Sequence, residues 1–246
     1  MLFIHLGALV SLPVVNLSCL IALGILYPVT AIGVTLGYHR MMSHKSFKTS
    51  KLVERILVTV AALSVQGSPM EWVGLHRHHH LHSDQDVDHH NSRKGLWWSH
   101  MGWMFQEVTA MAHIPELTKD MQKDPYYVWL EKYFLVPTLI LSVLLYLIGG
   151  WPLVGWGVFV RLVVVYHVTW LVNSATHTWG YRRFDTDDNS QNTWWVGLLA
   201  FGEGWHNNHH AKQARARHGL TWWEVDVTYG IISLMKRFNL AYDIKG

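Results

Sequence analysis

Long apolar stretches alternate with polar, histidine-bearing stretches along this chain. Residues 2–15 and 17–38 are apolar and separated by Asn16, and residues 133–150 and 153–175 form a second apolar pair joined by a Gly-Gly-Trp-Pro turn. A helix needs about 20 apolar residues to cross a bilayer, a length that 17–38 supplies. The stretch 2–15 is shorter, so its helix could tilt or stop part-way. The pattern predicts four transmembrane helices and an all-α integral membrane fold.

The apolar stretch 52–69 contains Glu54 and Arg55 and ends in Gly-Ser-Pro. Histidine clusters lie before and after it, and two clusters that bind one metal centre must lie on the same side of a bilayer. A single crossing by this segment would separate them. We therefore expect 52–69 to be a helix lying in the membrane interface.

The remaining polar segments, 39–132 and 176–246, are expected to form one helical cap. The apolar pair between them crosses twice and returns the chain to the same side. These segments contain most of the Lys and Arg residues. By the positive-inside rule the cap is cytoplasmic. No linker or repeat divides the chain, so residues 1–246 are expected to form one domain.

Composition supports a membrane protein. Charged residues make up 15% of the chain, against about 25% in soluble domains, and there are 14 Trp residues, which favour membrane interfaces. The net charge of +3 is too small to indicate a nucleic-acid partner. Cys19 is the only cysteine, which excludes a disulfide framework or a Cys-based metal site. The chain has 18 histidines against 17 acidic residues, an excess that needs a chemical reason.

The histidines concentrate in the clusters HRMMSH (39–44), HRHHH (76–80) and HNNHH (206–210), to which we add NSATH (173–177). Residues at i, i+3 and i+4 share one face of a helix. His76, His79 and His80 should therefore point together, as should His206, His209 and His210. Asn173 and His177 also share a face, whereas His78 points away.

His39 and His44 are five residues apart, so they do not share a face of a regular α-helix. That pair needs either a helix end or two separate metals. Counted with the other clusters, nine candidate ligands result: His39, His44, His76, His79, His80, His177, His206, His209 and His210. Nine imidazoles are enough for two metals with four or five ligands each.

Imidazole suits Fe, Zn, Cu and Ni, and oxygen chemistry in a membrane favours iron, although the spacing does not exclude zinc. The isolated histidines are interpreted as structural or exposed: His5, His100, His113, His167 and His218. Glu203 stands three residues before His206, a spacing used in soluble carboxylate-bridged di-iron sites. Because this match occurs once, we expect Glu203 to be a hydrogen-bond partner of a ligand histidine instead.

These motifs, in this order, resemble the Δ9 acyl desaturases of the membrane fatty acid desaturase family. HRMMSH, HRHHH, NSATH and GEGWHNNHH carry the resemblance, and the loop Asp84–Trp103 adds to it. The sequence GLHRHHHLHSD is most similar to that of bacterial, especially cyanobacterial-type, members. The resemblance runs from about Leu17 to Tyr242. One departure is His89, where many relatives carry proline.

The resemblance implies a mushroom-shaped four-span fold with a cytosolic cap and a di-iron centre held by the nine histidines. It implies that Asn173 holds a metal-bound water. The implied reaction removes two hydrogens from a saturated C16 or C18 acyl chain, using O2 and two electrons, and forms a cis double bond. The acyl group could be carried by a glycerolipid or by a thioester.

Such a reaction requires a bent apolar tunnel. Tyr27 and Leu23 are candidates for its closed end, with ordinary helix packing as the alternative. Candidates for binding the polar head of the substrate are Arg77, Asn91, Arg93, Lys94, Trp98 and Trp103, and the charged residues among them could instead be solvated or contact lipid phosphates.

Electrons must come from an external carrier, because the chain has no nucleotide-binding fingerprint. The resemblance suggests ferredoxin, with cytochrome b5 as the other candidate. Basic residues of the cap could dock it or could contact the membrane surface: Lys212, Arg215, Arg217, Lys236 and Arg237. Two rival functions share some of these features. One is a membrane di-iron hydroxylase or ketolase, and the other is a histidine-rich metal transporter.

Overall fold

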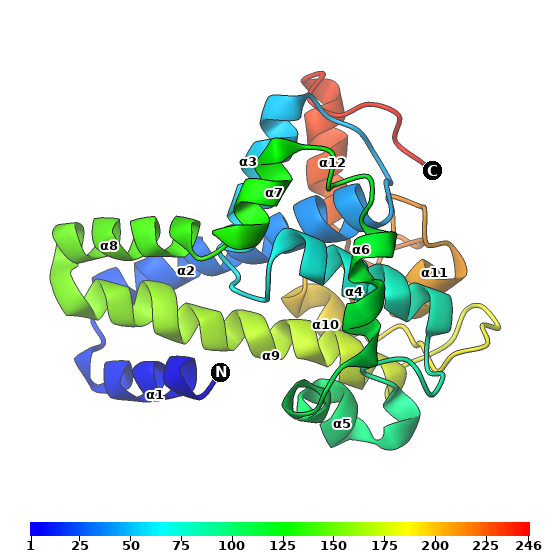
Figure 1. The fold of residues 1–246 in the computed structure, drawn as a ribbon, viewed down its shortest axis with the longest axis horizontal. Coiled ribbons are helices and arrows are strands. Elements are labelled where there is room, and N and C mark those ends of the chain that lie inside the picture. Colours follow the sequence, from blue (N-terminus) through cyan, green and yellow to red (C-terminus); the bar gives the residue numbers. More distant parts are fainter.

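Every regular element of this chain is a helix, as the sequence predicts. The computed structural model describes all 246 residues and contains no β-strand, only isolated bridges such as that between Lys48 and Tyr242. Four of the helices are α1 (Leu2–Ser11), α2 (Leu17–Gly33), α8 (Val136–Val154) and α9 (Arg161–Ser174). Figure 1 shows α1, α2, α8 and α9 side by side at one end of the molecule and the other helices gathered toward the opposite end.

These four helices carry apolar side chains on their outer faces. Leu17 and Leu147 are each 74% exposed, and Ile148 is 75% exposed. Exposed apolar surface of this kind is expected of helices that lipid surrounds. Two helical segments are long and apolar enough to cross a membrane, Leu17–Ser43 and Val136–His177, and the helix over Leu2–Val14 is apolar but shorter.

A sharp turn divides the segment Val136–His177 into two arms. Gly149 (φ −153°, ψ 20°) and Gly150 (φ 65°, ψ −157°) interrupt the helix. Gly150 adopts a conformation that is open to glycine because glycine has no Cβ. The turn lies where the Gly-Gly-Trp-Pro sequence predicts it. Figure 1 shows α8 and α9 running back alongside each other.

The segment after α2 is a π-helix, and this determines how the first histidine cluster is presented. It spans Val34–Ser43, so the helix continues beyond residue 38, where the sequence predicts its end. In a π-helix each backbone bond joins residues five apart, and one such bond runs from His44 N to His39 O at 3.2 Å. Residues five apart therefore lie nearly above one another. His44 is the residue directly after this π-helix, so of the two explanations left open for His39 and His44 the structure supports a helix end.

The interfacial helix predicted over 52–69 is shorter than expected. α3 spans Lys51–Ala62, and the chain is irregular until α4 begins at Pro69 and runs to His82. Val65 and Gly67 have φ values of 51° and 94°, which an α-helix does not allow. The apolar pattern continues through this turn, and so pattern alone places the helix end too late.

A capping box starts α4, the helix that carries the second histidine cluster. The Ser68 hydroxyl accepts a hydrogen bond from Glu71 N at 3.2 Å, and the Glu71 carboxylate accepts one from Ser68 N at 3.4 Å. Pro69 occupies the first helical position, where a backbone N–H would have no intrahelical acceptor, so proline loses no hydrogen bond there. The start of α4 is thus set by local chemistry.

We expect Ser68→Ala to destabilise the protein by about 1 kcal/mol, because it removes the acceptor for an otherwise unpaired N–H. For a chain of this size that corresponds to a fall in Tm of about 2–4 °C, measured by thermal unfolding in detergent. Ser233→Ala is the matched control, because the Ser233 hydroxyl donates only to Tyr229 O within its own helix, α12 (Val227–Arg237). An unchanged Tm for Ser68→Ala would contradict this role.

A hydrophobic core holds the π-helix against α3, α4 and α7 (Pro125–Lys132). Tyr38, Val58, Val73 and Leu130 are completely buried in it. The base of the first histidine cluster is therefore fixed by packing on three sides. The remaining helices of this end are α5 (Leu96–His100), α6 (Ile114–Leu117), α10 (Trp194–Leu199) and α11 (His206–Ala211).

Candidate metal centre

The nine candidate histidines lie together, although they come from four separate segments. These segments are the π-helix after α2, α4, the 3₁₀ turn Ala175–His177 after α9, and α11. Their ring nitrogens form two groups, and within each group the facing nitrogens all lie within 4.8 Å of one another. We call them the five-histidine group (His39, His44, His76, His80 and His209) and the four-histidine group (His79, His177, His206 and His210).

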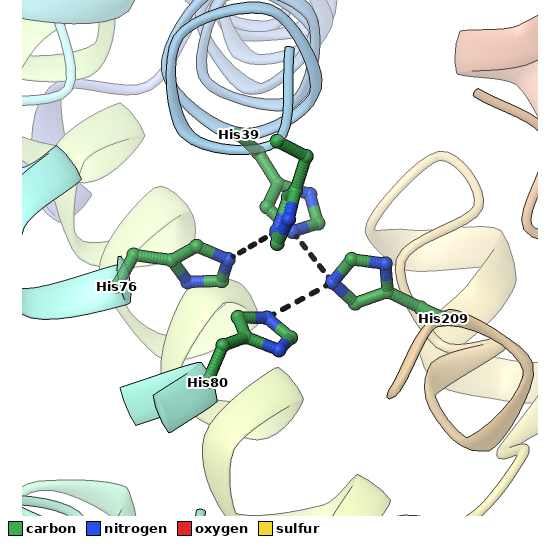
Figure 2. Close-up of side chains that lie close together, drawn as sticks. His39, His76, His80 and His209 are labelled. Atoms are coloured by element: carbon green, nitrogen blue, oxygen red, sulfur yellow. Dashed lines mark hydrogen bonds between the residues drawn. The ribbon is translucent and has the colours of Figure 1, made fainter. Parts of the chain in front are cut away.

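In the five-histidine group the Nε2 atoms face one another. Nε2 of His209 lies 3.1 Å from Nε2 of His39 and 3.0 Å from Nε2 of His80. Nε2 of His44 and Nε2 of His76 are 2.8 Å apart. Figure 2 shows His39 from the π-helix, His76 and His80 from α4, and His209 from α11 converging on a common centre.

The four-histidine group has the same inward orientation. Nε2 of His177 and Nε2 of His206 are 3.1 Å apart. Nε2 of His79 and Nε2 of His210 are buried and have no hydrogen-bond partner. All four rings are almost inaccessible to solvent. The group therefore presents buried nitrogens that the protein itself does not satisfy.

Each of the two later histidine clusters serves both groups. In α4, His76 and His80 belong to the five-histidine group and His79 to the other. In α11, His206 and His210 belong to the four-histidine group and His209 to the other. Residues at i and i+4 differ by about 40° around a helix, whereas i+3 is rotated by about 60° in the opposite direction. In each helix the three histidines share one broad face, as predicted. The pair at i and i+4 lies on one half of that face and belongs to one group, and the histidine at i+3 lies on the other half and belongs to the other group.

Carboxylates contact the outer nitrogens of four of these rings. The Nδ1 contacts pair His79 with Asp88 (2.9 Å), His177 with Asp84 (2.9 Å), His39 with Glu203 (2.7 Å), and His210 with Asp188. An ionised carboxylate can only accept, so it keeps the proton on Nδ1. The Nε2 lone pair is then left facing the centre of the group.

Glu203 also binds a completely buried arginine. Glu203 Oε1 accepts from Nε and Nη2 of Arg40 at 3.1 and 3.0 Å, and Arg40 Nη2 lies 2.9 Å from Asp226. Glu203 Oε2 lies 3.1 Å from Nδ1 of His218 as well as against His39. The sequence predicted that Glu203 would contact a candidate ligand. The structure places it beside His39 and not beside its near neighbour His206.

Burial keeps most of the imidazoles neutral. It lowers the pKa well below the ordinary histidine value, with neighbouring histidines lowering it further, for His44, His76, His80, His206 and His209. Burial also lowers the pKa of His210 to about 4, even though Asp188 acts in the opposite direction. At His79 the nearby Asp88 outweighs burial, and the pKa is raised.

The partner carboxylates are ionised. Burial would raise the pKa of Asp84, Asp88 and Asp188, but their histidine contacts and hydrogen bonds prevail and lower it. For Glu203 the Arg40 guanidinium has the largest opposing effect, and the pKa lies well below its usual range. Neutral imidazoles with ionised carboxylates behind them are the state in which histidines bind metals.

The donor set fits one transition-metal ion in each group. Nitrogens bonded to one ion at about 2.1 Å lie at most about 4.2 Å apart, close to the spacing of these atoms. The unpartnered Nε2 atoms of His79 and His210 are costly to bury unless something binds them. Imidazole donors suit iron, zinc, copper or nickel. The residues present are therefore compatible with a two-metal centre.

Two cavities adjoin beside the histidines. The first lies between α2 and α9, and its apolar wall includes Tyr27, Ala31, Val165 and Val168. The second, of about 570 Å³, extends from α4 and α9 toward the start of α1 and the segment 103–111. Both cavities are lined by Trp72, His76, Thr169 and Asn173. A molecule in the second cavity would therefore lie against His76, next to the first cavity.

The predicted substrate residues are divided between these cavities and other positions. Tyr27 lines the first cavity, where its hydroxyl donates to Leu199 O at 2.7 Å, and Trp103 lines the second. Leu23 lines neither and packs near Cys19 and Trp156. The other five contact loop residues. Arg77 binds Asp120, Asn91 accepts a hydrogen bond from Arg93 N, and the Arg93 side chain donates one to Asp187 O. Lys94 lies over the Trp98 ring, and the Trp98 indole N–H donates to His89 O.

Sequence reasoning missed several residues around the centre. Asp84, Asp88 and Asp188 are among them. His218, interpreted as structural or exposed, is buried against Glu203 and is therefore structural. Asp84 and Asp88 stand shortly after the second cluster, so an acid close to a histidine cluster was an available signal. Asp188 pairs with a histidine 22 positions away, a contact that no local spacing reveals.

Comparison with known proteins identifies the family of this chain. The model of the family described as fatty acid desaturase matches residues 13–229. The sn-1 stearoyl-lipid 9-desaturase of Anabaena variabilis is 52% identical, over 98% of this chain and 90% of the relative. The enzyme of the same name from Synechocystis sp. is 53% identical, over 90% of this chain and 70% of the relative. The sn-2 palmitoyl-lipid 9-desaturase of Nostoc sp. is 47% identical, over 86% of this chain and 75% of the relative. This chain belongs to the fatty acid desaturase family.

Proposed function

We propose that this chain introduces a cis double bond at the Δ9 position of a saturated C16 or C18 acyl chain carried by a glycerolipid. As a desaturase it is an oxidoreductase, and relatives at about half identity are named as stearoyl-lipid or palmitoyl-lipid 9-desaturases. Their names favour a lipid-bound substrate over a thioester. The observation that carries the proposal is the meeting of two cavities at two groups of buried histidines.

We further propose that each histidine group holds one iron ion, so that the nine histidines are the metal ligands. When bound, the iron pair would supply the activation of O2 that removal of unactivated hydrogens requires. The protein's histidines contribute neutral Nε2 lone pairs, oriented by packing and by carboxylates. Asn173 lines both cavities beside His76, a place from which its amide could hold a water next to the four-histidine group.

The residues shared by the two cavities position the acyl chain. The Trp72 indole N–H donates to Gln66 at 3.1 Å, and the Gln66 amide donates to Thr169 at 2.8 Å. The Trp72 ring is stacked on His76, with centroids 5.1 Å apart. This braced arrangement would hold one methylene against the histidines, as efficient catalysis demands. The methyl end of the chain would extend along the first cavity toward Tyr27.

In the membrane we propose four spans, formed by α1, α2 and the two arms of the Val136–His177 segment. The histidine clusters, α3 and the remaining helices would then form a cap on one side. The excess of Lys and Arg in the polar segments supports a cytoplasmic cap. The exposed apolar outer faces of the four helices support their contact with lipid.

Electrons would come from a separate protein. The basic side chains of Lys212, Arg217, Lys236 and Arg237 are exposed on the cap and could attract an acidic carrier. The similarity to cyanobacterial relatives favours ferredoxin over cytochrome b5.

The proposal is tested by expressing the chain in a desaturase-deficient host and analysing fatty acids by gas chromatography after separation of lipid classes. We expect new Δ9 monounsaturated C16 or C18 chains esterified in glycerolipids. Hydroxylated or ketone products without new double bonds would instead indicate the hydroxylase or ketolase. Unchanged lipids together with altered metal uptake would indicate a transporter.

A further inference from the structure

The two histidine groups differ in the carboxylates that stand behind them. In the four-histidine group, three of the four rings donate Nδ1–H to an aspartate, through the pairs His79–Asp88, His177–Asp84 and His210–Asp188. In the five-histidine group, only His39 contacts a carboxylate, that of Glu203. The group with fewer rings is thus the one with more acids behind it.

Nearby cations increase this difference. Glu203 binds Arg40, which also pairs with Asp226, so one positive charge offsets the acids behind the five-histidine group. Asp84, Asp88 and Asp188 have no Lys or Arg nitrogen within 4.0 Å, and their charge is compensated only by imidazoles and hydrogen-bond donors. Arg40, Glu203 and Asp226 together give a charge of −1 behind the five-histidine group. The three aspartates give a charge of −3 behind the four-histidine group.

Burial makes these charges effective. Asp84 and Asp88 are 2% and 1% exposed, and the Asp188 side chain is partly buried, with 10% exposed. Charge interactions are stronger away from water, and a carboxylate on the outer nitrogen makes an imidazole a better donor. Loss of one such partner typically lowers metal affinity about 10–100-fold. Three partners should therefore outweigh the one extra neutral ring of the five-histidine group.

We propose that the four-histidine group holds its metal ion more tightly than the five-histidine group, and that Asp84, Asp88 and Asp188 are the positioning residues responsible. This inference rests on the proposed two-iron centre. It predicts that the two ions leave in a fixed order, the ion of the five-histidine group first.

The test is the release of iron to a chelator from purified enzyme loaded with iron, followed by elemental analysis over time. For the wild-type chain we expect two phases of one iron each, the slower at least about tenfold slower. Asp188→Asn should accelerate the slow phase by about 10–100-fold and leave the fast phase unchanged. Asp188→Glu keeps the charge and should restore much of the slow phase. Glu203→Gln should accelerate only the fast phase.

Asp185→Asn is the matched control, because Asp185 lies in the same loop and its side chain is fully exposed. Its release curve should equal that of the wild type. If Asp188 acted only on folding, its variant would accelerate both phases and lower Tm. That result, or release of both irons from the wild-type chain in one phase, would overturn the inference and leave the proposed function intact. A wild-type chain that binds no iron would instead contradict the two-iron centre itself.

Discussion

Replacing His80 by alanine is expected to abolish double-bond formation. Nε2 of His80 lies 3.0 Å from Nε2 of His209, and His80 is one of the five rings that face one centre. Alanine removes one donor nitrogen from the group and leaves a cavity in its place. We expect product below about 1% of wild type by gas chromatography, together with loss of iron from the purified chain. The same outcome is expected for alanine at His76, His206 and His210.

His78→Ala is the matched control, two positions away on the same helix. His78 belongs to neither histidine group, and its ring lies near those of His82 and His113 instead. Because His78 is buried, the substitution should reduce stability slightly but leave most of the product. Full activity in His80→Ala would contradict its role as a ligand. Equal loss of product in both variants would show that α4 tolerates no change. The activity of His206→Ala in α11 would then decide whether the histidines are ligands.

Filling the first cavity should also remove activity, without removing iron. Tyr27, Ala31 and Thr35 follow one face of α2 and its π-helical continuation and line this cavity. Ala31→Phe places a ring in the space proposed for the methyl end of the acyl chain. We expect product from C18 chains to fall at least about tenfold, with overpacking costing about 1–3 kcal/mol of stability. Iron content should remain that of the wild type.

Ile25→Phe is the control for this substitution. Ile25 lies on the same helix and is 58% exposed on its outer face, where a larger ring meets no protein wall. Its activity should match that of the wild type. Normal C18 product from Ala31→Phe would show that the acyl chain does not occupy this cavity.

Much of the fold can be predicted from the apolar pattern because lipid-facing helices need long apolar runs. All four predicted apolar stretches are helical, and the turn at Gly149 and Gly150 is where the sequence places it. The π-helix after α2 could not be predicted, because α- and π-helices use the same residue types. It explains why the rings of two histidines five apart can face the same centre. The early end of α3 was also missed, since an apolar turn continues its pattern.

The histidines could be located because their chemistry is concentrated in short motifs, but their partition could not. Whether His79 joins His76 or His177 depends on how α4 faces α9 and α11, which is a property of packing. The carboxylates that contact distant histidines could not be predicted for the same reason. Asp84 and His177, for example, are 93 positions apart. The substrate role of polar residues such as Arg77 and Arg93 stays a prediction. In the structure Arg77 binds Asp120 and Arg93 donates to Asp187 O.

If these nine histidines hold two iron ions, the wild-type chain, purified in detergent and loaded anaerobically with ferrous iron, should contain two irons per chain. Elemental analysis of this preparation measures that number. A chain that retains no iron, or that binds one zinc and excludes iron, would show that the histidines do not form a two-iron centre.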